Sequence, residues 1–262
     1  MTNAALHVAR SGLDAQNTKM QVIANNLANV NTTGFKKDRA DFQTLAYQQL
    51  IAAGAASDAE SKFATGLSLG TGVMLAGTSR QDSQGTLNVT GNALDLAIEG
   101  NGYFQIQRSD GTTAYTRAGN FQRSAEGTVV TSDGLQVLPQ ITVPDGATSI
   151  TVGNDGTVSA TLQGQTAPVE VGKIELASFM NPAGLQSIGN NLLVETAASG
   201  APQVGAAGLD GRGALRQGSL ESSNVNVVEE LVDMIETQRA YEVNSKMIKA
   251  TDEMLQYANQ QL

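Results

Sequence analysis

The chain has 262 residues, a formal net charge of −9 at pH 7, no Cys and no Trp. The lack of Cys excludes disulfides and thiolate metal sites, and an acidic chain without a basic stripe is not expected to bind nucleic acid or anionic lipid directly. The length allows one large domain or two to three small ones. With 28 Gly and only 4% aromatic residues, we expect an interior of small aliphatic side chains in thin sheets.

Apolar residues recur at every seventh position near the start of the chain. A seven-residue repeat is typical of a helix with a narrow seam that packs against another helix. We predict one amphipathic helix from Thr2 to about Asn31, ended by Gly34. The seam consists of Leu6, Leu13, Met20 and Leu27, with Ala9, Gln16, Ile23 and Val30 on a second track. The amides of Asn25, Asn26 and Asn29 lie close to it and are candidates for fixing the register.

The middle of the chain has the pattern of β structure. Asp41 to Gln49 is predicted as a short helix or strand, and the Ala-, Ser- and Gly-rich stretch from Ile51 to Thr65 as a loop or weakly ordered hairpin. Alternation then continues to about Glu195 and predicts short strands joined by Gly-containing turns, which favours an antiparallel sandwich or barrel-like body. The main candidates are Leu94–Ile98, Tyr103–Arg108, Thr128–Thr131, Gln136–Leu138, Ser149–Val152, Thr157–Thr161, Val169–Ala177 and Asn191–Val194.

A second heptad pattern closes the chain. After a Gly- and Ala-rich connection, a helix is expected to begin near Asn224 or Asn226 and to run to the end. Its seam is Val227, Met234, Tyr241, Ile248, Leu255 and Leu262. One helix cannot bury such a seam, so the two ends should pair with each other or with neighbouring copies. The predicted fold class is α+β: long N- and C-terminal helices paired as a coiled-coil-like domain, with an inserted, mainly antiparallel β body.

The sequence offers little that could carry chemistry. The one histidine, His7, lies beside the helical seam, and Asn154-Asp155-Gly156 lacks the further acidic ligands of a calcium loop, so a hairpin turn explains it better. We predict no enzyme activity, no metal and no cofactor. Met1 to Arg10 lacks the pattern of a secretory signal, and no stretch approaches the ~20 apolar residues of a membrane span. That pattern is expected of a cytoplasmic protein or of one exported without a cleaved signal.

Two terminal segments and two central ones resemble the bacterial flagellar rod and hook family. The N-terminal segment is Ala24-Asn25-Asn26-Leu27-Ala28-Asn29-Val30-Asn31-Thr32-Thr33-Gly34-Phe35-Lys36. The C-terminal one runs from Ser219 through Asn224-Val225-Asn226-Val227-Val228-Glu229-Glu230-Leu231-Val232-Asp233-Met234-Ile235 and continues with Gln238-Arg239-Ala240-Tyr241-Glu242. The stretches Asp95–Phe104 and Ala114–Gly119 are also similar to the family. The length fits its rod members, and the stretch after Phe42 favours the distal type, with the proximal type as the alternative.

The resemblance implies an architecture and a role. Terminal helices of many subunits would form a coaxial inner tube within a hollow, helical drive shaft that carries torque to the hook and passes export substrates. The implied domains are 1–31 with 225–262 for the tube, 32–95 with 200–224 for an intermediate domain, and 96–199 for an outer β domain. The implied tube interface is Leu6, Leu13, Met20, Ile23, Leu27, Val30, Val227, Leu231, Met234, Tyr241, Ile248, Leu255 and Leu262.

An extended insertion at about 47–65, with Tyr47, Ile51 and Lys62, is expected to wedge between stacked subunits and stiffen the rod; a tolerated surface loop is the alternative. The implied partners are further copies of the chain, proximal rod proteins, the hook protein or its junction, the peptidoglycan- and outer-membrane-ring bushing, the rod cap and the flagellar type III export apparatus. The implied location is the periplasm-spanning rod, reached without a cleaved signal peptide.

Two other classes share parts of this pattern. A secreted adhesin or filament subunit could have the same helix–β–helix plan, and finding the chain in purified basal bodies would separate the two. A glycan hydrolase acting on the cell wall would need a pair of carboxylates in a cleft, and no such pair stands out in the sequence.

Overall fold

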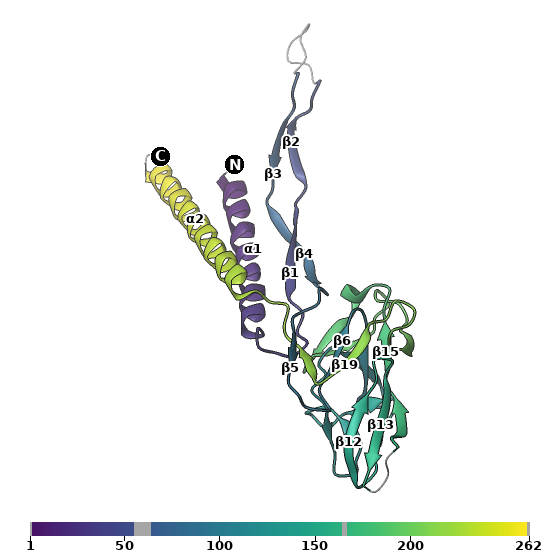
Figure 1. The fold of residues 1–262 in the computed structure, drawn as a ribbon. Helices are drawn as coiled ribbons and strands as arrows, with labels where there is room; N and C mark the ends of the chain where they lie inside the picture. The colour runs from purple at the N-terminus through teal and green to yellow at the C-terminus, as the bar shows by residue number, and fades with distance from the viewer. Residues whose placement is uncertain (1, 55–63, 164–166, 261–262) are drawn as a thin grey trace. The chain divides into compact units, whose positions relative to one another are not determined.

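A computed structural model describes residues 2–54, 64–163 and 167–260. Within these residues the chain forms a long α-helix near each end and, between them, mainly antiparallel β-strands, so the fold class is α+β (Figure 1). The chain divides into two compact units. Unit 1 comprises residues 1–27, 38–79 and 226–262, and unit 2 comprises residues 28–37 and 80–225.

The helices of unit 1 are α1 (Thr2–Ala28) and α2 (Val227–Gln260). Helix α1 ends before Asn31, the end expected from the sequence, because the next residues form a turn in which the Thr32 amide donates to Asn29 O at 3.1 Å. Helix α2 begins as predicted: the Asn226 side chain accepts a hydrogen bond from the Val228 amide at 3.1 Å. The two helices run antiparallel, with the start of α1 and the end of α2 at the same end of the unit (Figure 1).

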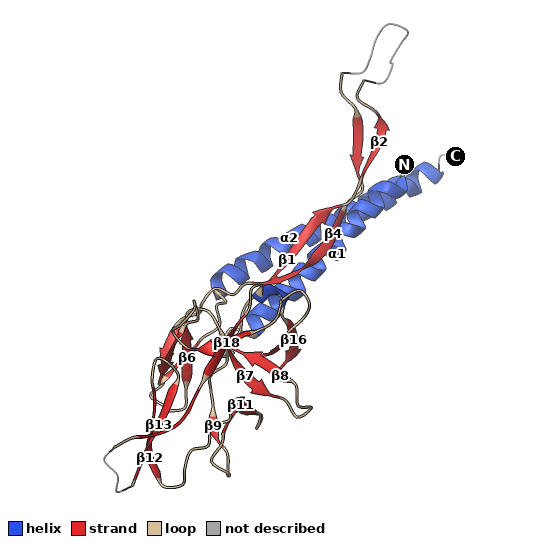
Figure 2. Cartoon of the chain, turned by 90° about the vertical axis from the view of Figure 1, so that its right-hand side faces the viewer, coloured by secondary structure: helices blue, strands red, loops and turns tan. Residues whose placement is uncertain are grey.

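The strands of unit 1 form two ribbons. Strands β1 (Asp38–Thr44) and β4 (Val73–Arg80) pair with each other, as do β2 (Tyr47–Ile51) and β3 (Leu67–Gly70), where Tyr47 lies opposite Gly70 (Figure 2). Asp41 to Gln49, for which the sequence predicts either a short helix or a strand, therefore lies mostly in strands β1 and β2. Ser11 of α1 joins helix to ribbon, because its Oγ accepts a hydrogen bond from the Val73 amide at 3.3 Å.

Unit 2 contains short strands connected by tight turns. In chain order they are β5 (Leu87–Val89), β6 (Leu96–Glu99), β7 (Tyr103–Gln107), β8 (Thr113–Thr116), β9 (Gln122–Arg123), β10 (Val129–Val130), β11 (Gln136–Leu138), β12 (Ala147–Val152), β13 (Thr157–Leu162), β14 (Val169–Lys173), β15 (Glu175–Ser178), β16 (Gln186–Gly189), β17 (Leu192–Val194), β18 (Gln203–Ala206), β19 (Ala214–Gln217) and β20 (Ser219–Glu221), with a 3₁₀ turn, η1, at Pro182–Gly184.

The largest sheet of unit 2, within the described residues, has the order β16-β17-β8-β7-β11-β10-β9, and β15 joins it by pairing with β7 and β18. A further sheet has the order β12-β13-β14, and β19 with β6 and β20 with β5 form separate pairs. The pairings are antiparallel, as the alternation and turn signals predict. Asp155 closes one of the predicted turns, since it accepts from both the amide and the hydroxyl of Thr157.

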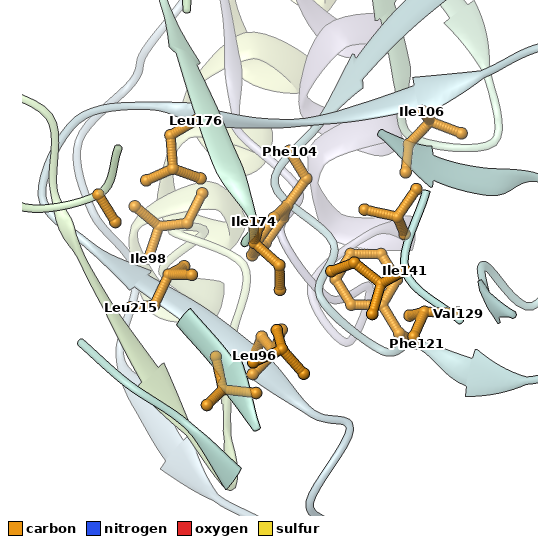
Figure 3. Packing of buried hydrophobic residues seen from close by; sticks show 14 of the residues in the cluster. Leu96, Ile98, Phe104, Ile106, Phe121, Val129, Ile141, Ile174, Leu176 and Leu215 are labelled. Atoms are coloured by element: carbon orange, nitrogen blue, oxygen red, sulfur yellow. The ribbon is translucent and has the colours of Figure 1, made fainter. Parts of the chain in front are cut away.

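The core of unit 2 is mostly aliphatic. Leu96, Ile98, Ile106, Leu176 and Leu215 are fully buried in it (Figure 3). One aromatic pair, Phe104 with Phe121, meets edge to face, with ring centroids 5.0 Å apart.

Candidate assembly surfaces

The predicted apolar seam of helix α1 is only partly covered in the single chain. In the single chain the buried side chains of α1 include Ala9, Ala15, Ile23 and Asn26. The seam residues Leu6, Leu13, Met20 and Leu27 are only partly covered, as is Val30 in the turn that follows. The second heptad track therefore faces the interior of unit 1 more than the first track does.

Helix α2 is apolar on faces that the single chain does not cover. Its buried side chains are polar, with Glu230 at 4% exposure and Thr237 at 1%. Met234 and Ile248 are half-buried, whereas Val227, Leu231 and Tyr241 are exposed. Further exposed apolar side chains are Val228, Val232, Ile235, Val243, Met247, Met254 and Tyr257. Contiguous exposed apolar side chains are typical of interaction surfaces. The side chain of Leu255 and residue Leu262 lie outside what the structure describes.

The two helices meet through polar and small residues. Asn26 Nδ2 donates to Glu230 Oε2 at 3.3 Å, and a Cβ atom at Gly12 would lie 3.0 Å from Asn244 Nδ2. Asn26 also binds the backbone of Asp38, accepting from its amide at 3.0 Å and donating to its carbonyl at 2.9 Å. Asn26 thus bridges from α1 to the backbone of a neighbouring segment. Its amide satisfies backbone groups that would otherwise lose their partners on burial.

Other residues of the terminal motifs come together in unit 2. Gly34 has φ +70°, and its amide donates to Glu221 O at 2.8 Å. Asn224 Oδ1 accepts from the Lys37 amide at 2.7 Å, while its Nδ2 donates to Gln81 O at 2.8 Å. The Asn224 amide donates to Phe35 O at 3.4 Å. Segments that are far apart in the sequence are thereby connected by backbone-directed hydrogen bonds.

A buried charge cluster lies beside these bonds. Lys36 Nζ donates to Glu221 Oε1 at 2.6 Å and to Ser83 O at 2.8 Å. Arg117 Nε lies 3.3 Å from Glu221 Oε2, an ion pair without hydrogen-bond alignment. Loss of hydration on burial lowers the pKa of Lys36, although Glu221 acts in the opposite direction. Burial and the neighbouring Asp82 raise the pKa of Tyr103 well above its usual range.

The β2–β3 ribbon has only two strands in the part of the chain that the structure describes, and it exposes several apolar side chains to solvent. Tyr47 is 63% exposed, and Leu50, Leu67 and Leu69 are also open to solvent, while Ile51 is partly covered. Lys62 lies outside the described residues. A two-stranded ribbon by itself is marginally stable in water, so this one needs a further surface against which to pack.

The described residues do not assemble a catalytic constellation. No group of three or more His, Asp or Glu side chains with metal-binding geometry occurs among them, and His7 lies on the surface of α1. A hollow of about 280 Å³ in unit 2 is lined by Tyr103, Arg117, Phe179 and Met180. Among the described residues that line this hollow, Asp82 is the one carboxylate. The hollow therefore does not present the pair of carboxylates that glycoside hydrolysis requires.

Comparison with known proteins shows which family the chain is similar to. Three family models match: "Flagella basal body rod protein" over residues 6–36, "Flagellar hook protein FlgE/F/G D1 domain" over 97–160, and "Flagellar basal body rod FlgEFG protein C-terminal" over 216–261. Flagellar basal-body rod protein FlgG of Buchnera aphidicola is 49% identical over 256 residues, covering 98% of both chains. The FlgG proteins of Caulobacter vibrioides and Borreliella burgdorferi are 48% and 47% identical over 98% and 97% of this chain and of their own lengths. The chain belongs to the flagellar basal-body rod protein FlgG family.

Membership in the FlgG family makes the chain a structural protein of the flagellar basal body and not an enzyme. A FlgF rod protein of Caulobacter vibrioides is also similar, at 36% identity over 98% of this chain. None of the described helices is long and apolar enough to span a membrane. The two terminal matched regions contain two members of the charge cluster, Lys36 in the first and Glu221 in the second, and the central matched region contains Arg117.

The family motif residues differ in what surrounds them. Asn26, Gly34, Lys36, Val225 and Glu230 are buried. Asn25, Asn31, Leu231, Gln238, Arg239 and Tyr241 are exposed, and Asn29, Thr32, Phe35 and Asn224 are intermediate. Sequence reasoning missed Arg117 and Glu221 as functional candidates. Both lie in segments that resemble the family, but a single charged residue in the sequence gives no signal of its own burial.

Proposed function

We propose that the chain is the subunit of the flagellar distal rod. Copies polymerise helically into a hollow, rigid drive shaft that transmits torque from motor to hook and passes export substrates. The observation that carries the proposal is the similarity to FlgG rod proteins over nearly the whole chain, at up to 49% identity. The exposed apolar side chains of α2 and the only partly covered seam of α1 support it, because a subunit that remained monomeric would leave them in contact with water.

The terminal helices, residues 1–31 and 225–262, form the inner tube in this proposal. Fully burying one large aliphatic side chain is worth roughly 1.5–3 kcal/mol, so a partly exposed one still has up to roughly a third of that to gain. Leu27 of α1 and Ile248 of α2 are partly exposed in this way, and Val228 is 70% exposed. Helices of neighbouring copies bury these faces, with the heptad seams as the contact lines.

The rest of the chain surrounds the tube. Residues 32–95 and 200–224 form the intermediate domain, and residues 96–199 form the outer β domain. The insertion at about 47–65 reaches along the shaft and packs on stacked neighbours through Tyr47 and Leu50, which are exposed in the single chain. Fixed in this way, it blocks the sliding between subunits that bending requires.

The proposal also names partners and a location. At its ends the rod meets proximal rod proteins and the hook protein or its junction, and around it lies the bushing of the peptidoglycan and outer-membrane rings. Assembly proceeds beneath a rod cap, and subunits reach it through the flagellar type III export apparatus without a cleaved signal peptide. The rod spans the periplasm.

The alternative is a proximal rod subunit, which the 36% identity to a FlgF protein favours less than the 49% identity to a FlgG protein. Cryo-electron microscopy of basal bodies purified from the source bacterium distinguishes the two. We expect this sequence to fit density of the distal rod, with α1 and α2 lining the channel. Density that fits only the proximal segment would favour the alternative, and absence from the rod would refute both.

A further inference from the structure

The carboxylate of Glu221 is held at a fixed place inside unit 2. Strand β20 pairs with β5 in a register that sets Glu221 opposite Leu87, and the Glu221 side chain is 0% exposed. Its Oε1 accepts from Lys36 Nζ at 2.6 Å and from the Gly85 amide at 3.0 Å, while its Oε2 faces Arg117. The Glu221 side chain thus joins three separate parts of the chain, namely its own strand β20 and the segments of Lys36 and Gly85, and it faces Arg117 as a further cation.

Three of these parts are the connections by which the chain enters or leaves unit 2. Residues 34–37 precede its boundary at residue 37, residues 80–86 follow its boundary at residue 80, and residues 219–224 precede its boundary at residue 225. They are also hydrogen-bonded to one another: the Gln81 amide donates to Lys37 O at 2.9 Å and the Ser222 amide to Thr86 O at 2.9 Å. Asn224 adds its bonds to Lys37 and Gln81.

We propose that the Glu221 cluster is a latch through which these three connecting segments open and close as one unit while the β body of unit 2 stays folded. Withdrawing residues 34–37 takes away Lys36 and leaves Glu221 with less counter-charge, whereas withdrawing β20 leaves Lys36 and Arg117 buried without it. A buried charge that loses its partner is strongly destabilising, so partly opened states are disfavoured. The core of unit 2 lies in other strands, so it does not depend on the latch being closed.

Native-state hydrogen exchange on the full-length protein tests the latch. The reporters are the amides of Gly34, Lys37, Gly85 and Asn224, whose acceptors lie in the latch. The core reference is the amide of Ile106 in β7, a fully buried residue. We expect the reporters to share one free energy of opening that is lower than that of the reference. Different free energies among the reporters, or one equal to that of the core, would overturn the proposal.

The variant Glu221→Gln gives a second, independent measurement. It keeps an acceptor for the Gly85 amide but removes the carboxylate charge that Lys36 and Arg117 share, so we expect exchange at all four reporters to become on the order of 100-fold faster. The matched control is Glu126→Gln, which neutralises an exposed carboxylate bonded to Ser124 and should leave the reporters unchanged. If exchange accelerates equally at the reporters and in the core, Glu221 contributes only to overall stability. If it accelerates in one segment alone, the effect of Glu221 is only local. Either result would overturn the proposal. If Glu221→Gln does not fold, the wild-type exchange pattern decides.

Discussion

Replacing Gly34 by Ala perturbs unit 2 at a position where two requirements coincide. The backbone of Gly34 has φ +70°, which L-residues with a Cβ rarely adopt. A Cβ there would also lie 2.6 Å from Arg117 C and 2.7 Å from Ala118 N, and both of these atoms are backbone. Neither atom can move unless the backbone at Arg117 and Ala118 shifts. That backbone positions the Arg117 side chain opposite Glu221.

The expected cost is the sum of these two effects. The left-handed conformation costs roughly 1–2 kcal/mol for a residue with a Cβ. Forcing extra volume into a packed site typically adds about 1–3 kcal/mol. For a domain of roughly 150–250 residues, each 1 kcal/mol lowers Tm by about 2–4 °C, so a total of about 2–5 kcal/mol for Gly34→Ala should lower the Tm of unit 2 by roughly 4–20 °C.

Differential scanning calorimetry of the full-length protein measures this, with Gly111→Ala as the matched control. Gly111 also has positive φ, +81°, but a Cβ there would meet nothing within 4 Å. It should therefore show the conformational cost alone, about 1–2 kcal/mol. If the two variants lower Tm equally, the close approach of Gly34 to Arg117 is not a constraint and the reasoning fails.

Three further predictions concern assembly. Leu27→Asp or Ile248→Asp should abolish polymerisation and motility but leave the circular dichroism of the β body unchanged, because a charge is costly in a dry helix interface. The control is Gln21→Asp, which changes an exposed site and should leave motility unchanged. Normal motility in either Leu27→Asp or Ile248→Asp would contradict the place of these residues in the inner tube. Protease treatment of the monomer should cleave first within α1 and α2, whose apolar faces are uncovered, and full protection of both would refute this. Deletion of Gln48 to Lys62 should give curved or flexible polymers when viewed by electron microscopy, whereas straight, stiff rods would favour a tolerated surface loop.

Local patterns in the sequence were sufficient for the secondary structure at the ends and for the class of the middle. The heptads predicted both terminal helices, and Asn226 was a predicted start of the second one, because the capping side chain and the backbone that it binds are close in sequence. Alternation with turn residues predicted antiparallel strands for the same reason. The paired terminal motifs indicated the family. The ribbon β2–β3 was less clear, since its strands flank a stretch with no periodicity.

Burial was decided by tertiary structure. A heptad shows which side of a helix is apolar but does not say whether its partner belongs to the same chain, and in the single chain Leu27 and Ile248 remain partly exposed. The cluster of Lys36, Arg117 and Glu221 depends on segments up to 185 residues apart. No local pattern distinguishes a buried charge from a solvated one, because burial is set by what the rest of the fold brings to it.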